Sequence, residues 1–183
     1  PVLGKALPVI RMLLSEEKAK VVRFRHNSLI AKFYRNQQEY HRISLPLTPD
    51  IIVYCKSRYL FIEQSSTAEK IVESFRHQLP RFLNEYGYLP KVILIKDHGL
   101  LAVEQSVSAA ESVLDVYEDL LRISHYSSSC GGPKFMSPDQ SSFIDKWEVE
   151  NYRRKVGLKS GEEHKLAGKG AVVDIKNHGD SRL

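Results

Sequence analysis

Apolar residues recur along this chain at two spacings, and each spacing predicts a different element. A repeat of three to four residues predicts helices at residues 7–14, 29–34, 66–86, 108–123 and 137–152. Short apolar runs rich in β-branched and aromatic residues predict strands at 20–25, 51–55, 59–63, 91–95, 100–103 and, briefly, 171–173. Because strands and helices alternate, the pattern favours a compact α/β domain, with a mostly β core covered by helices, over a bundle or a β-sandwich.

Start and stop signals mark the ends of the predicted helices. Pro80 removes a backbone donor inside the third helix, so we expect it to kink or divide that helix, and Gly87 ends it. Asn27 or Ser28 is expected to cap the short helix predicted at residues 29–34. Three further sequences have the spacing of a capping box: Ser66 to Glu69, Ser108 to Glu111, and Ser137-Pro138-Asp139-Gln140.

Apolar periodicity is lost from Gly157 onward, and this loss predicts two parts: a domain at 1–156 and a basic segment at 157–183. Residues 153–183 hold eight Lys or Arg against four Asp or Glu, whereas residues 1–152 are nearly neutral, with 19 against 18. A solvated basic tail explains this surplus better than nucleic-acid binding, because aromatic and basic residues do not interleave. The chain also begins without methionine, so we expect it to be a fragment.

Composition narrows the class of protein further. With 42% hydrophobic residues the chain has enough apolar material for a globular core. No run approaches the roughly 18 apolar residues of a membrane helix. The two cysteines, Cys55 and Cys130, lack the spacing of a metal site, and Cys55 lies in an apolar run, so we expect it to be a free buried thiol. These features predict a soluble cytoplasmic protein without a membrane or nucleic-acid partner.

The segment 91–103, KVILIKDHGLLAV, places a His-Gly pair between two predicted strands, and a long helix follows. This arrangement resembles the class II aldolase/adducin family. The resemblance implies a class II aldolase-like layered fold, and it implies that His98 corresponds to a histidine that serves as one zinc ligand. The family usually has glycine where Glu104 stands, so the turn before the helix differs here.

A wider similarity extends from about residue 7 to residue 156, and the segments that match best are 46–54, 86–92, 131–136 and 147–154. They resemble the later part of long proteins in which an aldolase region precedes a short-chain dehydrogenase, several of them in rhamnose-type sugar catabolism. Residues 166–173 look like the first dehydrogenase strand, but no glycine-rich turn follows them. Without that turn there is no backbone cradle for pyrophosphate, so we expect no dinucleotide binding by this chain.

The resemblance implies zinc-dependent retro-aldol cleavage of a sugar phosphate by a homo-oligomer. A catalytic zinc takes three protein ligands, and the family draws two of them from a His-x-His pair that this sequence lacks. We therefore expect zinc in the full-length protein and none in this chain alone. The alternative is a non-enzymatic, adducin-like interaction module. Besides His98, the histidines are widely spaced: His26, His41, His77, His125, His164 and His178.

Other residues with chemical potential have an ordinary structural explanation as well. Trp147 and Phe143 have helical spacing and are expected in the core. We nominate no catalytic residue, because the family's catalytic acid lies upstream. Four carboxylates qualify as acid/base groups only if they cluster near His98: Glu63, Glu69, Asp97 and Glu104. Charged element ends explain the remaining candidates, Lys91, Lys96, Arg153 and Arg154 with the adjacent Tyr152.

Overall fold

The computed structural model describes residues 2–15 and 18–147. Residues Pro1–Asp145 form one compact unit, and a second unit begins at Lys146. The helices of the first unit are α1 (Val2–Leu14), α2 (Ile30–Phe33), α3 (Gln37–His41), α4 (Pro49–Cys55), α5 (Ala68–Tyr86), α6 (Val107–Ser127) and the 3₁₀ turn η1 (Ser128–Cys130). Residues 138–147 are also helical. The predicted boundary at residue 157 lies outside the described residues.

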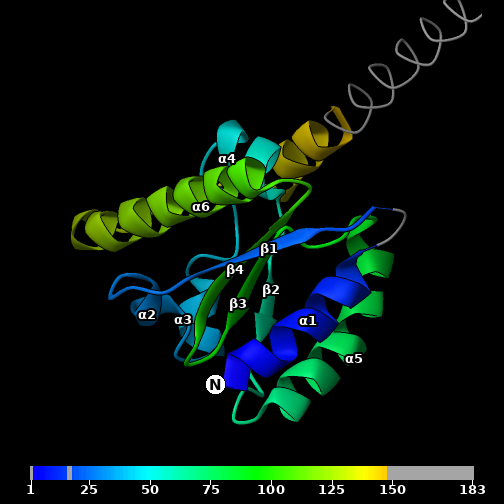
Figure 1. Cartoon of the computed structure of the whole chain (residues 1–183). Helices are drawn as coiled ribbons and strands as arrows, with labels where there is room; N and C mark the ends of the chain where they lie inside the picture. The colour runs from blue at the N-terminus through cyan, green and yellow to red at the C-terminus, as the bar shows by residue number, and fades with distance from the viewer. Residues whose placement is uncertain (1, 16–17, 148–183) are drawn as a thin grey trace, which may run out of the picture. The chain divides into compact units, whose positions relative to one another are not determined.

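Four strands form one mixed sheet in the order β1-β4-β3-β2 (Figure 1). The strands are β1 (Val21–Arg25), β2 (Leu60–Ile62), β3 (Val92–Ile95) and β4 (Gly99–Glu104). β4 pairs antiparallel with both β1 and β3, whereas β2 runs parallel to β3. The parallel strands β2 and β3 are joined through α5. Because they run in the same direction, their carboxyl ends lie at the same end of the sheet.

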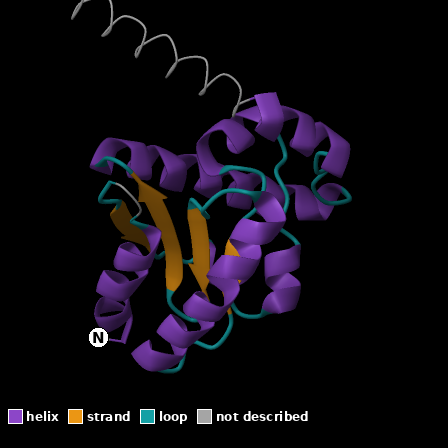
Figure 2. Ribbon diagram, turned by 90° about the vertical axis from the view of Figure 1, so that its right-hand side faces the viewer, coloured by secondary structure: helices purple, strands orange, loops and turns teal. Residues whose placement is uncertain are grey.

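Helices cover both faces of the sheet, which gives three layers (Figure 2). On one face α1 and α5 pack through Ile10, Ile71 and Phe75 against alternate strand residues such as Ile93. The other face packs against α2, α3, α4 and α6. Strand residues are buried on both faces because each layer of helices brings its own apolar stripe. The α/β fold class predicted from the sequence is confirmed.

Helix α5 is continuous from Ala68 to Tyr86, although Pro80 lies inside it. Of the two expected effects of that proline, a kink or a division, the division is therefore wrong. The helix is held through the proline by its buried face, which includes Ile71, Phe75 and Phe82. Thr67, one residue after the predicted cap, accepts a hydrogen bond from the amide of Lys70, and Gly87 closes the helix in the left-handed conformation with φ 76°.

Residues 51–55 are helical, so the strand predicted there is wrong. Thr48 is the N-cap of α4, and its side chain accepts a hydrogen bond from the amide of Ile51. Pro49 occupies the start of the helix, where its missing amide hydrogen costs nothing. The apolar run that favoured a strand instead buries Ile52 and Cys55 beside α6. Capping and packing thus override the β propensity of these residues.

Other helix ends differ from the prediction by one or two residues or match it. Ser106 caps α6, two residues before the predicted cap. The N-cap of α2 is Leu29, which makes no side-chain cap bond, whereas the side chain of Asn27 accepts from the amide of Ile30 at 2.9 Å, the bond expected of a cap. The predicted capping box at Ser137 is confirmed, because Ser137 and Gln140 exchange backbone-to-side-chain bonds of 2.9 and 3.2 Å. The sequence pattern did not predict the short helix α3.

The helix at 138–147 does not bury its aromatic residues. Phe143 is 71% exposed and Trp147 is 54% exposed, so the expectation that both belong to the core is wrong. The small residue Ser141 is the buried one instead. Among residues 2–15 and 18–147 no helix combines the length and the apolar character that crossing a membrane requires.

Candidate functional site

A polar cavity of about 400 Å³ lies where the parallel strands β2 and β3 end. Two segments line it: the loop from β2 to α5, residues 63–66, and the β3–β4 turn, residues 96–98. Both segments follow the carboxyl ends of neighbouring parallel strands, and α5 begins directly beyond the loop. Clefts at this position commonly bind ligands in α/β proteins, because loops and a helix start converge there.

Backbone bonds hold the β3–β4 turn in place. The amide of Lys96 donates to the carbonyl of Ile62 at 2.9 Å, which extends the β2–β3 pairing by one bond. The amide of His98 donates to the carbonyl of Ile95 at 3.0 Å. Asp97 has φ 58°, a left-handed conformation that aspartate tolerates better than most residues. This turn therefore fixes the backbone from which Lys96, Asp97 and His98 line the cavity.

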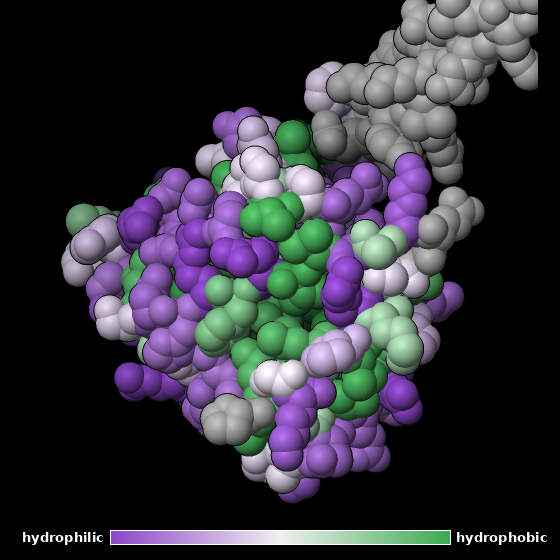
Figure 3. All heavy atoms as spheres, viewed as in Figure 1, coloured by the Kyte–Doolittle hydropathy of each residue, from purple (hydrophilic) through white to green (hydrophobic). Residues whose placement is uncertain are grey.

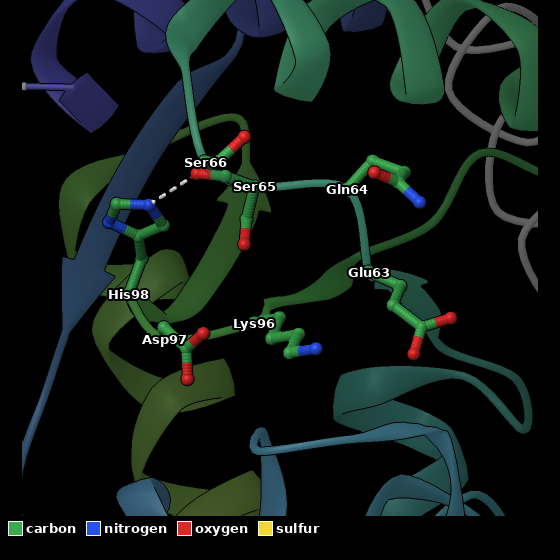
Figure 4. A pocket seen from close by; sticks show the side chains of 7 residues that line it. All are labelled: Glu63, Gln64, Ser65, Ser66, Lys96, Asp97 and His98. Atoms are coloured by element: carbon green, nitrogen blue, oxygen red, sulfur yellow. Dashed lines mark hydrogen bonds between the residues drawn. The ribbon is translucent and has the colours of Figure 1, made fainter.

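The imidazole of His98 reaches across the cavity to the other segment (Figure 4). Its Nε2 lies 2.9 Å from the carbonyl oxygen of Ser65, which is a buried residue. A carbonyl oxygen only accepts, so Nε2 carries the hydrogen and, in the neutral ring, Nδ1 has the lone pair. In Figure 4 Nδ1 lies on the side of the ring away from Lys96 and Glu63. The hydrogen bond to the carbonyl of Ser65 thus positions the imidazole ring of His98.

The four candidate carboxylates divide between several places. Glu63 and Asp97 line the cavity with His98, although the Asp97 carboxylate and the His98 ring point in different directions (Figure 4). Glu69 lies beside a separate cavity of about 200 Å³ at the start of α5. Glu104 forms an ion pair with Lys91 at the opposite end of β3 and β4. Only two of the four therefore accompany His98.

Asp97 also acts on a neighbouring tyrosine. Burial raises the pKa of Tyr34, and the negative charge of Asp97 raises it further, because both effects disfavour the phenolate. The hydroxyl of Tyr34 lies 2.8 Å from Nε2 of His26. His26 therefore has a partner of its own beside the turn.

Among the described residues His98 is the histidine that lines this cavity. His41 is an exposed residue 3.4 Å from the side-chain amide of Gln37, and His125 lies 2.7 Å from Nζ of Lys32. Within residues 2–15 and 18–147 no three His, Cys, Asp or Glu side chains form a group suited to a metal ion. A zinc site of the kind implied by the resemblance needs three such donors, so these residues do not fit it.

Sequence reasoning missed that Gln64, Ser65, Ser66 and Lys96 line a cavity with His98. The pattern along the chain marks Ser66 only as a helix cap and Lys96 only as a solvated strand end. The order strand, helix, strand at 59–95 is the available signal, because a crossover of this kind makes the two strands parallel and brings their carboxyl ends together. Nothing in the spacing alone shows which side chain reaches across.

Comparison with known proteins gives likeness in structure only, since no family model and no curated sequence matches the chain. YgbL from Escherichia coli, a candidate aldolase, epimerase or decarboxylase, has a TM-score of 0.57 at 10% identity over 78% of this chain. YgbL from Klebsiella pneumoniae has a TM-score of 0.56 at 13% identity over 76% of this chain. The fold is aldolase-like.

The chain spans 64% of the length of each YgbL protein. A structure of L-fuculose 1-phosphate aldolase gives a TM-score of 0.49 at 15% identity, over 68% of this chain and 53% of that one, which is too low to support an argument. The aldolase-like fold expected from the His-Gly segment is confirmed. At these identities the likeness concerns the fold, and the activity is a matter for proposal.

Proposed function

We propose that this chain is an aldolase-like domain that binds a phosphorylated sugar and that, by itself, does not catalyse retro-aldol cleavage. The observation that carries the proposal is the polar cavity in which the turn with His98 faces the start of α5 at the carboxyl ends of β2 and β3. The fold shared with YgbL, a candidate aldolase, epimerase or decarboxylase, supports the aldolase-like part of the proposal. The cavity is lined almost entirely by polar side chains, as a sugar with its many hydroxyls requires.

The lining residues offer two kinds of contact to a phosphorylated sugar. The ammonium of Lys96 supplies positive charge for a phosphate, and Ser66, on the opposite segment, carries an exposed hydroxyl (Figure 4). The carboxylates of Glu63 and Asp97 accept hydrogen bonds from sugar hydroxyls. Carboxylates repel phosphate, so the ammonium of Lys96, which lies between Asp97 and Glu63 in Figure 4, is needed to offset their charge where the phosphate binds.

The proposed lack of turnover follows from the side chains that are available as zinc ligands. Zinc supplies Lewis-acid stabilisation of the enediolate in a class II retro-aldol reaction. Among the described residues His98 belongs to no group of three side chains that could hold a metal ion, and its Nε2 hydrogen is engaged by the carbonyl of Ser65. We therefore derive no metal-dependent step for this chain, and we propose that zinc binding and cleavage belong to a longer relative.

The test is titration of the purified chain with a ketose 1-phosphate, followed by calorimetry and by amide shifts in the NMR spectrum. Binding is expected to perturb the amides of residues 63–66 and 96–98, and Lys96→Ala is expected to weaken it about tenfold or more. Lys70→Ala is the matched control, because Lys70 is exposed on α5 outside the cavity. Binding that leaves these amides unmoved would refute the site.

Turnover is tested separately by assaying aldehyde release with added zinc. We expect no rate above a metal-free control. A zinc-dependent rate that disappears in His98→Ala would overturn the proposed inactivity while leaving the binding site intact.

The wider proposal of a cytoplasmic protein joined to a dehydrogenase of rhamnose-type catabolism is tested by the complete reading frame on both sides of the chain.

A second candidate function is a non-enzymatic module that assembles with further copies. It is favoured by β1, an edge strand in which Phe24 is 45% exposed. Apolar side chains also gather between α6 and α1 on the face that β1 crosses (Figure 3). Light scattering over a range of concentrations measures the assembly. A concentration-dependent mass without sugar-phosphate binding would favour this second function.

A further inference from the structure

The strand β2 lies at the end of the sheet yet has the character of an interior strand. All three of its residues, Leu60, Phe61 and Ile62, are buried, so both of its faces are covered. The opposite edge strand, β1, carries Arg23 and Arg25. Edge strands are usually protected by charge, proline or bulges, whereas interior strands read as continuous apolar runs. β2 has none of these edge features.

Hydrogen bonds show which backbone groups of β2 face outward. The carbonyl of Ile62 accepts from Lys96 and therefore points toward β3. The carbonyl of Tyr59 accepts from the hydroxyl of Tyr40 on α3, at 2.6 Å, and therefore points away from β3. Because peptide groups alternate in direction along a strand, the N–H and C=O of Phe61 face the open edge. Within the described part of the chain neither group has a hydrogen bond on that side.

A cavity of about 420 Å³ lies beside this open edge. Its lining includes residues of β2, of α3 on one face of the sheet and of α5 on the other face. A cavity that touches helices of both layers as well as a strand can lie only at the sheet edge. Polar side chains form its rim, among them Gln37, Gln78, Arg81 and Glu85.

Each hydrophobic layer ends in aromatic rings at this cavity. Tyr40 and Phe61 are stacked, with ring centroids 5.0 Å apart, on the side of α3. Phe82 and Tyr86 meet edge to face, with centroids 4.8 Å apart, on the side of α5. A strand placed between them would direct alternate side chains toward the two ring pairs, and it would continue both layers of the core.

We propose that the edge of β2 is a docking site for a fifth strand. The occupant is an extended polypeptide segment with apolar side chains on both faces, paired with the N–H and C=O of Phe61. A second copy of this chain is a poorer fit, because α3 and α5 line the cavity from both sides and leave its own β2 recessed. The ring pairs on both sides of the cavity favour an extended segment that places side chains on both of its faces. Glu63 is the residue that this cavity shares with the sugar-phosphate cavity.

The test uses a seven-residue probe peptide, lysine-valine-isoleucine-valine-threonine-valine-lysine, acetylated and amidated. Its addition to the isotope-labelled chain is expected to shift the Phe61 amide and to slow its hydrogen exchange at least tenfold. The same peptide with every amide nitrogen methylated is expected to leave the Phe61 amide unchanged, because it cannot donate to the edge. Equal binding of the methylated peptide would overturn strand pairing.

A cavity-filling variant tests the place of binding. Gln78→Trp, on the α5 rim, is expected to weaken peptide binding at least tenfold, whereas Arg76→Trp is the matched control, exposed on α5 outside the cavity. The proposal would be overturned if both variants bound the peptide with equal affinity. It would also be overturned if the amide shifts were confined to the β1 edge, or if millimolar peptide caused no shift. A ketose 1-phosphate titration of Gln78→Trp that matches the wild type would show that the two sites are distinct.

Discussion

Gly99 and Arg25 lie so close that a side chain at Gly99 would collide with the backbone of β1. A Cβ atom built on Gly99 would lie 2.6 Å from the carbonyl oxygen of Arg25 and 2.8 Å from the ring of Phe24. Gly99 also has φ 151°, which other residues rarely adopt. The glycine of the His-Gly pair therefore has a structural reason: it permits β1 to pair with the start of β4.

Gly99→Ala is accordingly expected to destabilise the fold by about 2–4 kcal/mol, because both the backbone strain and the collision must be relieved. Gly87→Ala is the control. Gly87 also has a positive φ, but nothing lies within 4 Å of the point that a Cβ atom would occupy there, so only the strain of about 1–2 kcal/mol is expected. Urea unfolding measures both, and equal effects would contradict the proposed collision.

Arg25 joins β1 to α6 through three carboxylates and is expected to contribute more to stability than a surface arginine. Its guanidinium lies 3.0 Å from Glu111, 2.7 Å from Asp115 and 3.1 Å from Glu118. Arg25→Ala leaves these like charges unopposed and is expected to cost about 1–3 kcal/mol in unfolding free energy at low salt. High salt is expected to reduce this loss.

Arg122→Ala is the comparison for the preceding change. Arg122 is an exposed side chain that pairs with Asp119 and Glu118 along the same helix. Its loss is expected to cost less than about 1 kcal/mol. Unfolding experiments that rank the two variants the other way would show that the contacts of Arg25 across two elements do not stabilise the fold.

The two cysteines are expected to differ in reactivity. Burial raises the pKa of Cys55 to about 12, and its thiol donates to the carbonyl of Val113, 3.6 Å away. Cys130 is exposed. At pH 8 iodoacetamide should therefore modify Cys130 alone in the folded protein, and both thiols in urea, as mass spectrometry would show. Native modification of Cys130→Ser would contradict the burial of Cys55.

Asp145 makes the stability of the fold depend on pH. Burial raises its pKa, and a hydrogen bond from the hydroxyl of Ser57 opposes that shift only in part. The folded state then binds more protons than the unfolded state between the ordinary pKa and the raised one, so stability falls as pH rises through this window. Above the window the cost of the charged form is fully present.

Asp145→Asn removes that cost while its side chain still accepts from Ser57. We expect this variant and the wild type to be equally stable at pH below the ordinary aspartate pKa, and the variant to be the more stable at neutral pH. Urea unfolding between pH 3 and pH 8 measures the difference. A variant that is less stable at every pH would show that the carboxylate stabilises the fold instead.

The sequence could predict the elements where one local signal was dominant. The continuous apolar run before Lys96 identified β3, and the cap at Ser137 was found together with its partner Gln140. Residues 51–55 misled the prediction because their β-rich composition competes with the Thr48 cap, and packing of Ile52 and Cys55 decided between them. Pro80 does not divide α5, because burial of a long helix face outweighs one lost hydrogen bond.

The amino-acid order by itself determined that strands and helices alternate, that Cys55 is buried and that His98 stands at the end of an apolar strand, because each of these depends on near neighbours in the chain. The tertiary structure alone decided that Ser65 accepts from the His98 ring across 33 positions of sequence, and that β2 keeps an open edge. Such contacts depend on which strands become neighbours, and that choice is made by the packing of whole layers.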